Sequence, residues 1–149
     1  MSRPPKVEIR WIRSREHTDV AMLQRRAYHS YTSVEAVDEF SRHANHIPKV
    51  LLVDNKVIGC NFYALHSKFI LIHWLKVAEE QQGLGYEVQM INELKRELAN
   101  LHRCLIAVIL REDDLASQLL FKKCGFKWCR TFKYHNESQD YYVLKFEAT

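Results

Sequence analysis

Two glycines separated by one residue, Gly83 and Gly85, are the feature of this sequence best suited to binding a charged ligand. They follow an apolar run, residues 69–75, and precede apolar residues at helical spacing. The first turn of a helix has N–H groups without intrahelical partners, and its dipole favours negative charge. Because glycine lacks a Cβ, a phosphate can approach the backbone closely. Residues 80–86 are therefore a candidate phosphate or pyrophosphate cradle; a turn that needs glycine only for its geometry is the alternative.

Two common phosphate motifs do not fit these glycines. A dinucleotide fingerprint needs a third glycine where Val88 stands. A P-loop ends in Gly-Lys-Ser/Thr, whereas Gly85 is followed by Tyr86 and Glu87. Neither fold-specific motif is predicted.

Histidines are the other residues with chemical potential. His73 is the one polar residue of the apolar run, and its tunable pKa suits a general base. A core histidine bonded to a neighbour's backbone is the alternative interpretation. His43 and His46 have i, i+3 spacing, but no third ligand is evident, so a solvated helix end is favoured and no metal site is predicted.

Length and composition indicate a single soluble domain over residues 1–149, with 47% hydrophobic and 27% charged residues. The net charge of +4 includes no block of like charges, so no nucleic-acid partner is predicted. The four cysteines have no CxxC spacing, which favours free thiols in a reducing compartment. Neither a signal peptide nor a membrane span is expected, and the predicted location is cytoplasmic.

Hydrophobic periodicity predicts an alternation of strands and helices along the chain. A capping box at Thr32 and Glu35 would start the second helix, and Pro48 would mark the end of that region. Asp54-Asn55 would be the turn of a hairpin. Strands are expected at 7–12, 50–53, 57–65, 69–75, 104–110, 126–134 and 141–146, and helices at 18–28, from 32, from 84 to 101 and from 113 or 114 to 124.

The two later helices have predicted inward faces. The third would bury a stripe that starts at Leu84 and ends at Leu101, and the fourth would bury Leu115, Leu119, Leu120 and Cys124 before ending at Gly125. The central apolar run would be a strand covered on both faces. The order β-α-α-β-β-β-α-β-α-β-β predicts an α/β (α+β) fold: a mixed, mostly antiparallel sheet of about seven strands flanked by about four helices.

This order, with Gly83-Leu84-Gly85 opening the third helix, resembles the GNAT superfamily of acetyl-CoA-dependent N-acetyltransferases. The resemblance covers roughly residues 7–146. Within the family the sequence is most similar to the ribosomal-protein-alanine type, which acetylates protein N-termini, through Arg111 and Tyr134. A second family motif is matched in the frame Asp114, Ser117, Leu120-Phe121 and Gly125-Phe126.

The resemblance implies a role for each matched residue. Backbone N–H groups of residues 81–86 would hold the CoA pyrophosphate, and backbone near Leu75 and Val77 would pair with the pantetheine arm. His73 and Tyr134 are the catalytic candidates. The cofactor residues implied are Leu75, Val77, Glu80, Gln81, Gln82, Gly83, Leu84, Gly85, Tyr86, Asp114, Ser117 and Phe121.

The sequence also departs from the family pattern. Glu80 stands where the phosphate motif usually begins with Gln or Arg, unless Gln81 or Gln82 takes that role in a shorter loop. A carboxylate beside a pyrophosphate is unfavourable unless it points away. Phe121 replaces the usual tyrosine acid and has no proton to give.

The glutamate that many members use as a base falls on Phe69 or Ile109, both apolar. Three interpretations follow: a water-relayed base with solvent protonating the thiolate, His73 as the base, or a domain that binds CoA without catalysis.

The predicted function is transfer of acetyl from acetyl-CoA to a primary amine, with a protein or peptide N-terminus as the first choice of acceptor. The alternatives are a catalytically silent CoA-binding or protein-interaction domain and an electrostatic nucleic-acid binder. The expected partners are acetyl-CoA and the amine, without nucleic acid or membrane, for a monomer or homodimer.

Overall fold

Seven strands and four α-helices form the described part of this computed structural model, residues 3–27 and 32–148. The strands are β1 (Val7–Trp11), β2 (His46–Val53), β3 (Lys56–Leu65), β4 (Ile70–Val77), β5 (Leu105–Arg111), β6 (Lys127–Lys133) and β7 (Asp140–Glu147). The helices are α1 (His17–Ala27), α2 (Val34–Arg42), α3 (Tyr86–Glu97) and α4 (Leu115–Lys123), with short 3-10 turns η1 (Ser14–Glu16) and η2 (Glu79–Gln81).

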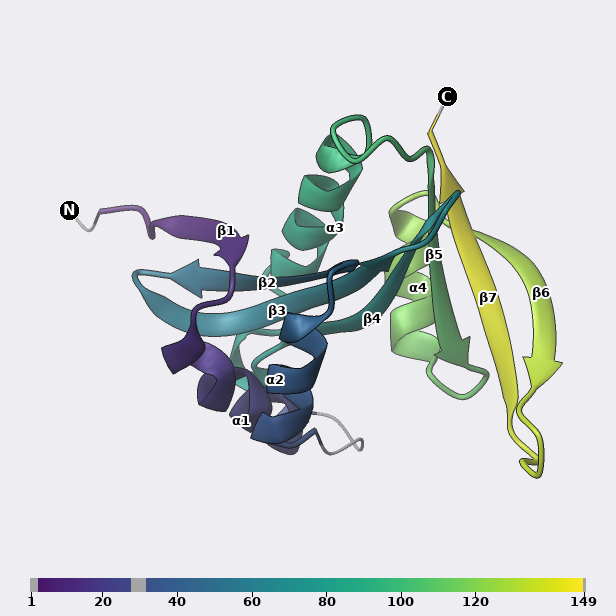
Figure 1. Cartoon of the computed structure of the whole chain (residues 1–149), viewed down its shortest axis with the longest axis horizontal. Helices are drawn as coiled ribbons and strands as arrows, with labels where there is room; N and C mark the ends of the chain where they lie inside the picture. The colour runs from purple at the N-terminus through teal and green to yellow at the C-terminus, as the bar shows by residue number, and fades with distance from the viewer. Residues whose placement is uncertain (1–2, 28–31, 149) are drawn as a thin grey trace.

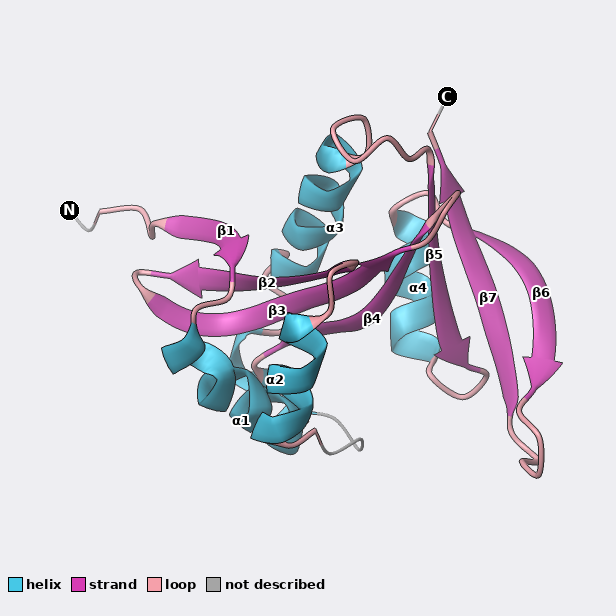
Figure 2. Cartoon of the chain, in the orientation of Figure 1, coloured by secondary structure: helices cyan, strands magenta, loops and turns pink. Residues whose placement is uncertain are grey.

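All seven strands belong to one sheet in the order β1-β2-β3-β4-β5-β7-β6 (Figure 1). β4 and β5 are parallel, and every other neighbouring pair is antiparallel. The helices α1 and α2 pack on one face and α3 and α4 on the other (Figure 2). The predicted fold and element order are confirmed.

The β2–β3 hairpin has the predicted turn, with positive φ at Asp54 (50°) and Asn55 (68°), two residue types that tolerate this conformation. However, β2 already begins at His46, so the prediction that Pro48 marks a boundary was wrong. The Pro48 carbonyl accepts the last bond from the β1 side, from the Ile12 N–H at 2.8 Å. Pro48 has no N–H to donate, but it lies opposite the end of β1, where the sheet hydrogen bonds to that strand stop.

Helix α2 begins one residue later than predicted. Ser33 Oγ, not Thr32, accepts a hydrogen bond from the Ala36 N–H at 3.1 Å, so the capping box predicted at Thr32 and Glu35 was wrong. Val37 and Phe40 form the buried apolar face of this helix. The predicted end of the first helix, residue 28, lies outside the described residues.

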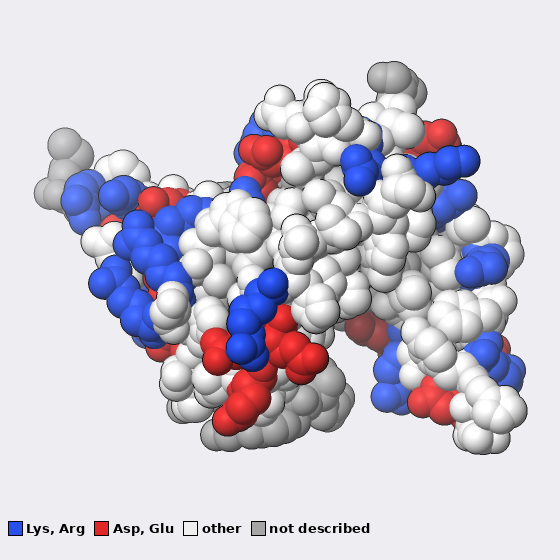
Figure 3. All heavy atoms as spheres, viewed as in Figure 1, with Lys and Arg blue, Asp and Glu red and all other residues white. Residues whose placement is uncertain are grey.

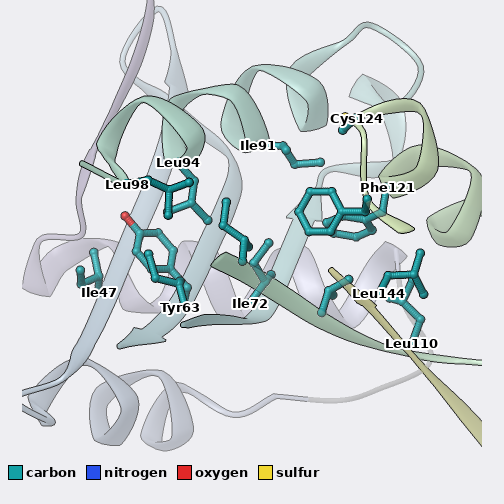
Figure 4. Packing of buried hydrophobic residues seen from close by; sticks show 14 residues of the cluster. Ile47, Tyr63, Ile72, Ile91, Leu94, Leu98, Leu110, Phe121, Cys124 and Leu144 are labelled. Atoms are coloured by element: carbon teal, nitrogen blue, oxygen red, sulfur yellow. The ribbon is translucent and has the colours of Figure 1, made fainter. Parts of the chain in front are cut away.

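The largest core cluster lies between the sheet and the helices α3 and α4 (Figure 4). Ile91, Leu94 and Leu98 are buried there as the predicted stripe of α3 requires. Leu84 is the exception: it precedes the helix and is 61% exposed. Met90, which the predicted stripe omitted, is fully buried.

The inward face of α4 is as predicted at Leu120 and Cys124, which belong to or pack against the core cluster, but not at its other two residues. Leu115 and Leu119 are 65% and 64% exposed, whereas Gln118 and Phe121 are buried. Figure 4 shows Phe121 beside Ile91 in the core. The helix is therefore rotated relative to the predicted face, and Phe121 supplies its main apolar anchor.

Candidate functional site

The central feature of the sheet is the separation of β4 from β5. Their parallel register begins at Ile70↔Ile106 and ends at Ile72↔Val108, although β4 continues to Val77. β5 stays paired with β7 over its whole length. The two strands therefore diverge at their carboxyl ends, which is where open α/β sheets bind ligands.

The turn after β4 offers a row of backbone donors beside this opening. Gly83 and Gly85 have φ of +80° and +88°, and a Cβ at either position would meet no atom within 4 Å. Gly85 is the N-cap of α3 and provides no side-chain cap. The N–H groups of residues 83–88 have no hydrogen-bond acceptor among the residues that the structure describes. Such a row of donors at a helix N-terminus fits a phosphate or pyrophosphate group.

Carboxylates and amides border the turn. Glu80 lies exposed on η2, and the Gln82 side-chain amide donates to the Val77 carbonyl at 3.3 Å. Glu87, in the first turn of α3, is half-buried, and burial raises the pKa of its carboxyl above its usual range. Protonation of Glu87 would remove one negative charge from the anion-binding end of the helix.

The second flank of the opening is the N-terminus of α4. Asp114 Oδ1 accepts from the Ser117 N–H at 3.1 Å, so of the two positions predicted for the start of this helix, 113 and 114, Asp114 is the N-cap. The predicted C-terminal glycine is confirmed too, because Gly125 has φ of +88°. Their roles toward a cofactor stay predictions.

A buried glutamine holds the β5–α4 loop in shape and was not recognised from the sequence. Gln118 is 6% exposed, and its Nε2 donates to the carbonyls of Arg111 (3.1 Å) and Glu112 (3.0 Å). Glu112 Oε1 then accepts from Gln139 Nε2 at 3.1 Å in the loop before β7. These bonds tie the β6–β7 hairpin to the loop that leads into α4.

His73 sits at a β-bulge of β4, between the pairs Phe62↔Trp74 and Tyr63↔Ile72. His73 is exposed, and its ring packs against Phe40 with centroids 5.4 Å apart. The interpretation as a core histidine was therefore wrong, as was the expectation that the strand is covered on both faces. Burial, followed by the charges of neighbouring histidines, lowers the pKa of His73.

Tyr134 directly follows β6, at the start of the loop that closes the β6–β7 hairpin, and the end of this hairpin borders a surface hollow (Figure 3). Figure 3 shows this hollow between the helices α1 and α2 and the end of the β6–β7 hairpin. Tyr134 is 48% exposed, and its ring contacts Phe132 and Tyr141 at 5.0 and 4.7 Å between centroids. No contact between Tyr134 and His73 is found in the described part of the chain.

Of the remaining residues predicted to bind the cofactor, most lie on β4 or at the glycine turn, and one is buried in the core. Leu75 and Val77 lie on β4 beside the opening, with Leu75 opposite Asn61 of β3. Leu84 and Tyr86 flank the Gly85 N-cap, so Leu84, Gly85 and Tyr86 all lie at the turn. The Phe121 ring is 2% exposed, and this burial does not support its predicted contact with a cofactor.

Two features are absent from residues 3–27 and 32–148. No group of three or more His, Cys, Asp or Glu side chains has the geometry to hold a metal ion. No helix is long and apolar enough to cross a membrane.

Solved structures with this fold include several acetyltransferases. The ribosomal-protein-S18-alanine N-acetyltransferase from Escherichia coli superposes with a TM-score of 0.84 at 12% identity, covering 97% of this chain and 95% of that one. Arabidopsis thaliana Naa50, in complex with the bisubstrate analogue CoA-Ac-MVNAL, has a TM-score of 0.77 at 16% identity, with 95% and 98% covered. A GNAT family acetyltransferase from Elizabethkingia anophelis with acetyl-CoA bound has a TM-score of 0.75 at 17% identity, with 95% and 97% covered.

No curated protein matches the sequence. At these identities the structural likeness establishes the fold alone. A sequence model of the Acetyltransferase (GNAT) family matches residues 8–126, which is most of the chain. The match includes β4, the glycine turn and the two helices that flank the opening. This chain therefore belongs to the GNAT acetyltransferase family.

Proposed function

We propose that this protein transfers the acetyl group of acetyl-CoA to a primary amine, and that the acceptor is the N-terminus of a protein or peptide. The observation that carries the proposal is the opening between β4 and β5, flanked by the unpaired N–H groups of residues 83–88. Those donors would hold the pyrophosphate, and the edge of β4 near Leu75 and Val77 would pair with the amides of the pantetheine arm.

His73 is the proposed base. The lowered pKa of His73 keeps its ring neutral at neutral pH, so a ring nitrogen can take a proton from the acceptor ammonium. The neutral amine would then attack the thioester carbon of acetyl-CoA; the C–S bond breaks as the amide forms, and the second proton of the attacking nitrogen is lost to solvent. The thiolate leaves and is protonated by solvent, because Phe121 has no proton to give. Tyr134, directly after β6, is the second catalytic residue proposed and would contact the acceptor.

The choice of a protein N-terminus is supported by the hollow between α2 and the β6–β7 hairpin, which is open to the surface (Figure 3). A relative of the same fold, Naa50, is solved with CoA joined to the peptide MVNAL. An open hollow admits an extended chain end without enclosing the rest of the acceptor.

A matched pair of substitutions at Gly83 tests the cofactor site. Asp and Asn both tolerate positive φ, and the Cβ enters open space, so Gly83→Asp and Gly83→Asn differ mainly in charge. At one hundred times its Kd, acetyl-CoA should raise the melting temperature of the wild type by about 5–10 °C. The rise should largely persist in Gly83→Asn and vanish in Gly83→Asp.

No rise in the wild type would refute the cofactor site and the proposed function with it. If both variants lost the melting-temperature rise equally, the loss would come from a changed backbone and not from repulsion between a carboxylate and a bound anion.

The alternative is a catalytically silent CoA-binding domain, and the burial of Phe121 at the position of the usual acid favours it. Such a protein would be stabilised by acetyl-CoA but would release no CoA thiol with any peptide amine. Thiol release that depends on peptide would exclude it.

A further inference from the structure

Three histidine rings cluster with Phe40 on the sheet face that α2 covers. His46 begins β2, His73 lies at the bulge of β4, and His43 follows the last turn of α2. The ring centroids of His43 and His46 are 4.8 Å apart, and those of His46 and His73 are 5.8 Å apart. Phe40 contacts both His46 and His73.

The position and tautomer of His46 are fixed. Its Nδ1 lies 3.0 Å from the Phe40 carbonyl oxygen. Because a carbonyl oxygen only accepts, Nδ1 is the donor, and Nε2 keeps the lone pair when the ring is neutral. The ring also stacks on Phe40, with centroids 4.0 Å apart and planes 28° from parallel.

The charges that act on His73 are those of two histidines. After burial, which is the larger cause, positive charge on His46 and then on His66 lowers the pKa of His73. His66 lies in the β3–β4 loop and stacks on Phe69 at 4.6 Å. The described side chains of α1 and α2, which pack on the same sheet face, exert no comparable charge effect on His73.

We propose that His46 is a positioning residue for His73: the Phe40 carbonyl and ring hold the His46 imidazole beside the His73 ring, 5.8 Å away between centroids, so that His73 is kept as a neutral base. At this separation a proton on either ring disfavours a proton on the other. His73 thereby stays neutral and accepts the proton that the acceptor ammonium loses. The same repulsion returns that proton to water after the amine has attacked. This role in the reaction rests on the proposed function, whereas the coupling of the two rings does not.

Histidine titrations by NMR on the free protein test the coupling. His46→Gln removes the second ring, His46→Phe keeps a ring stacked on Phe40 without a titrating group, and His135→Gln is the control at an exposed loop histidine. The signal that disappears in His73→Gln identifies His73. Its titration midpoint should rise by roughly one pH unit in both His46 variants and stay in place in the control. An unchanged midpoint in both His46 variants would overturn the proposal.

The pH profile of kcat/KM tests the role in catalysis. In His46→Gln the acid limb should move to higher pH together with the His73 midpoint. A limb that stays in place while the midpoint moves would overturn the positioning role. If no amine supports turnover, the proposed function fails and so does the catalytic role of the pair, while the NMR titration still decides whether the rings are coupled.

Discussion

At the scale of single residues, the position of His73 is set by a local irregularity of β4. The bulge gives the strand one residue more than its partner, and the His73 side chain contacts Phe40 of α2. Contact with Phe40 and His46 removes part of its hydration, and the pKa of His73 falls below its ordinary value. A neutral imidazole at the surface of a cleft is suited to accept a proton.

Replacing the proposed base should slow the proposed reaction without weakening cofactor binding. His73→Gln is expected to lower kcat/KM by about 10²–10⁴-fold. The melting-temperature rise with acetyl-CoA should persist, because the donors of residues 83–88 are unchanged. An unchanged rate would point instead to a water-relayed base.

The activity of the wild type should also depend on pH in a defined direction. The pKa of His73 is lowered, so the active neutral ring is present near pH 7 and is lost as pH falls through that lowered pKa. The acid limb of kcat/KM should therefore lie below about 6.5, the ordinary histidine value. A limb above that value would contradict the assignment.

At the scale of elements, an ion pair beneath α3 fixes this helix to the sheet. Lys49 Nζ of β2 lies 2.9 Å from Glu93 Oε1 of α3, and the two side chains are only 12% and 15% exposed. Asn61 and the Tyr63 hydroxyl lie on the same sheet face, and their buried polar atoms have no partner among the described residues. The helix that presents the glycine turn is thus held by a partly satisfied polar layer as well as by apolar packing.

A double-mutant cycle should separate the ion pair from this packing. Lys49→Met leaves the buried Glu93 carboxylate without its cation and should cost about 3–5 kcal/mol in the free energy of unfolding. The double variant Lys49→Met/Glu93→Leu should recover most of that loss. Urea unfolding measures the free energy of unfolding of both variants, provided that the m-value does not change between them. A double variant as unstable as the single one would show that the charges themselves stabilise α3.

Much of this arrangement was accessible from the sequence, because strands and helices leave different hydrophobic periods and glycines mark turns. The failures have a common physical cause. Leu115 and Leu119 have the same spacing as a buried face, but Phe121 provides a larger buried surface and decides the rotation of α4. The contact between the His46 and His73 rings joins residues 27 positions apart in the sequence, so no local sequence pattern reveals it.

At the scale of the whole molecule, the sheet consists of two parts joined at one short seam. Only three register pairs connect β4 to β5, whereas β5 and β7 share seven. A ligand that lies along β4 and against the N-termini of α3 and α4 would bridge the two parts. The junction is therefore the region that binding should order most.

Amide hydrogen exchange should locate that ordering. Acetyl-CoA is expected to slow exchange at residues 73–77 and 83–88, and to leave β1 and the β2–β3 turn unchanged. In Gly83→Asp the protection should disappear. Protection that spreads evenly over the sheet would indicate general stabilisation and would contradict a ligand at the seam.

The row of donors at residues 83–88 has a consequence for how this chain can evolve. Main-chain amides recognise a ligand whatever side chain accompanies them, provided that the backbone keeps its path. Selection then acts on conformation, at the two glycines above all, and leaves most neighbouring side chains free to change. The Escherichia coli enzyme has this fold at a TM-score of 0.84 with 12% identity, so the backbone path is compatible with very different side chains.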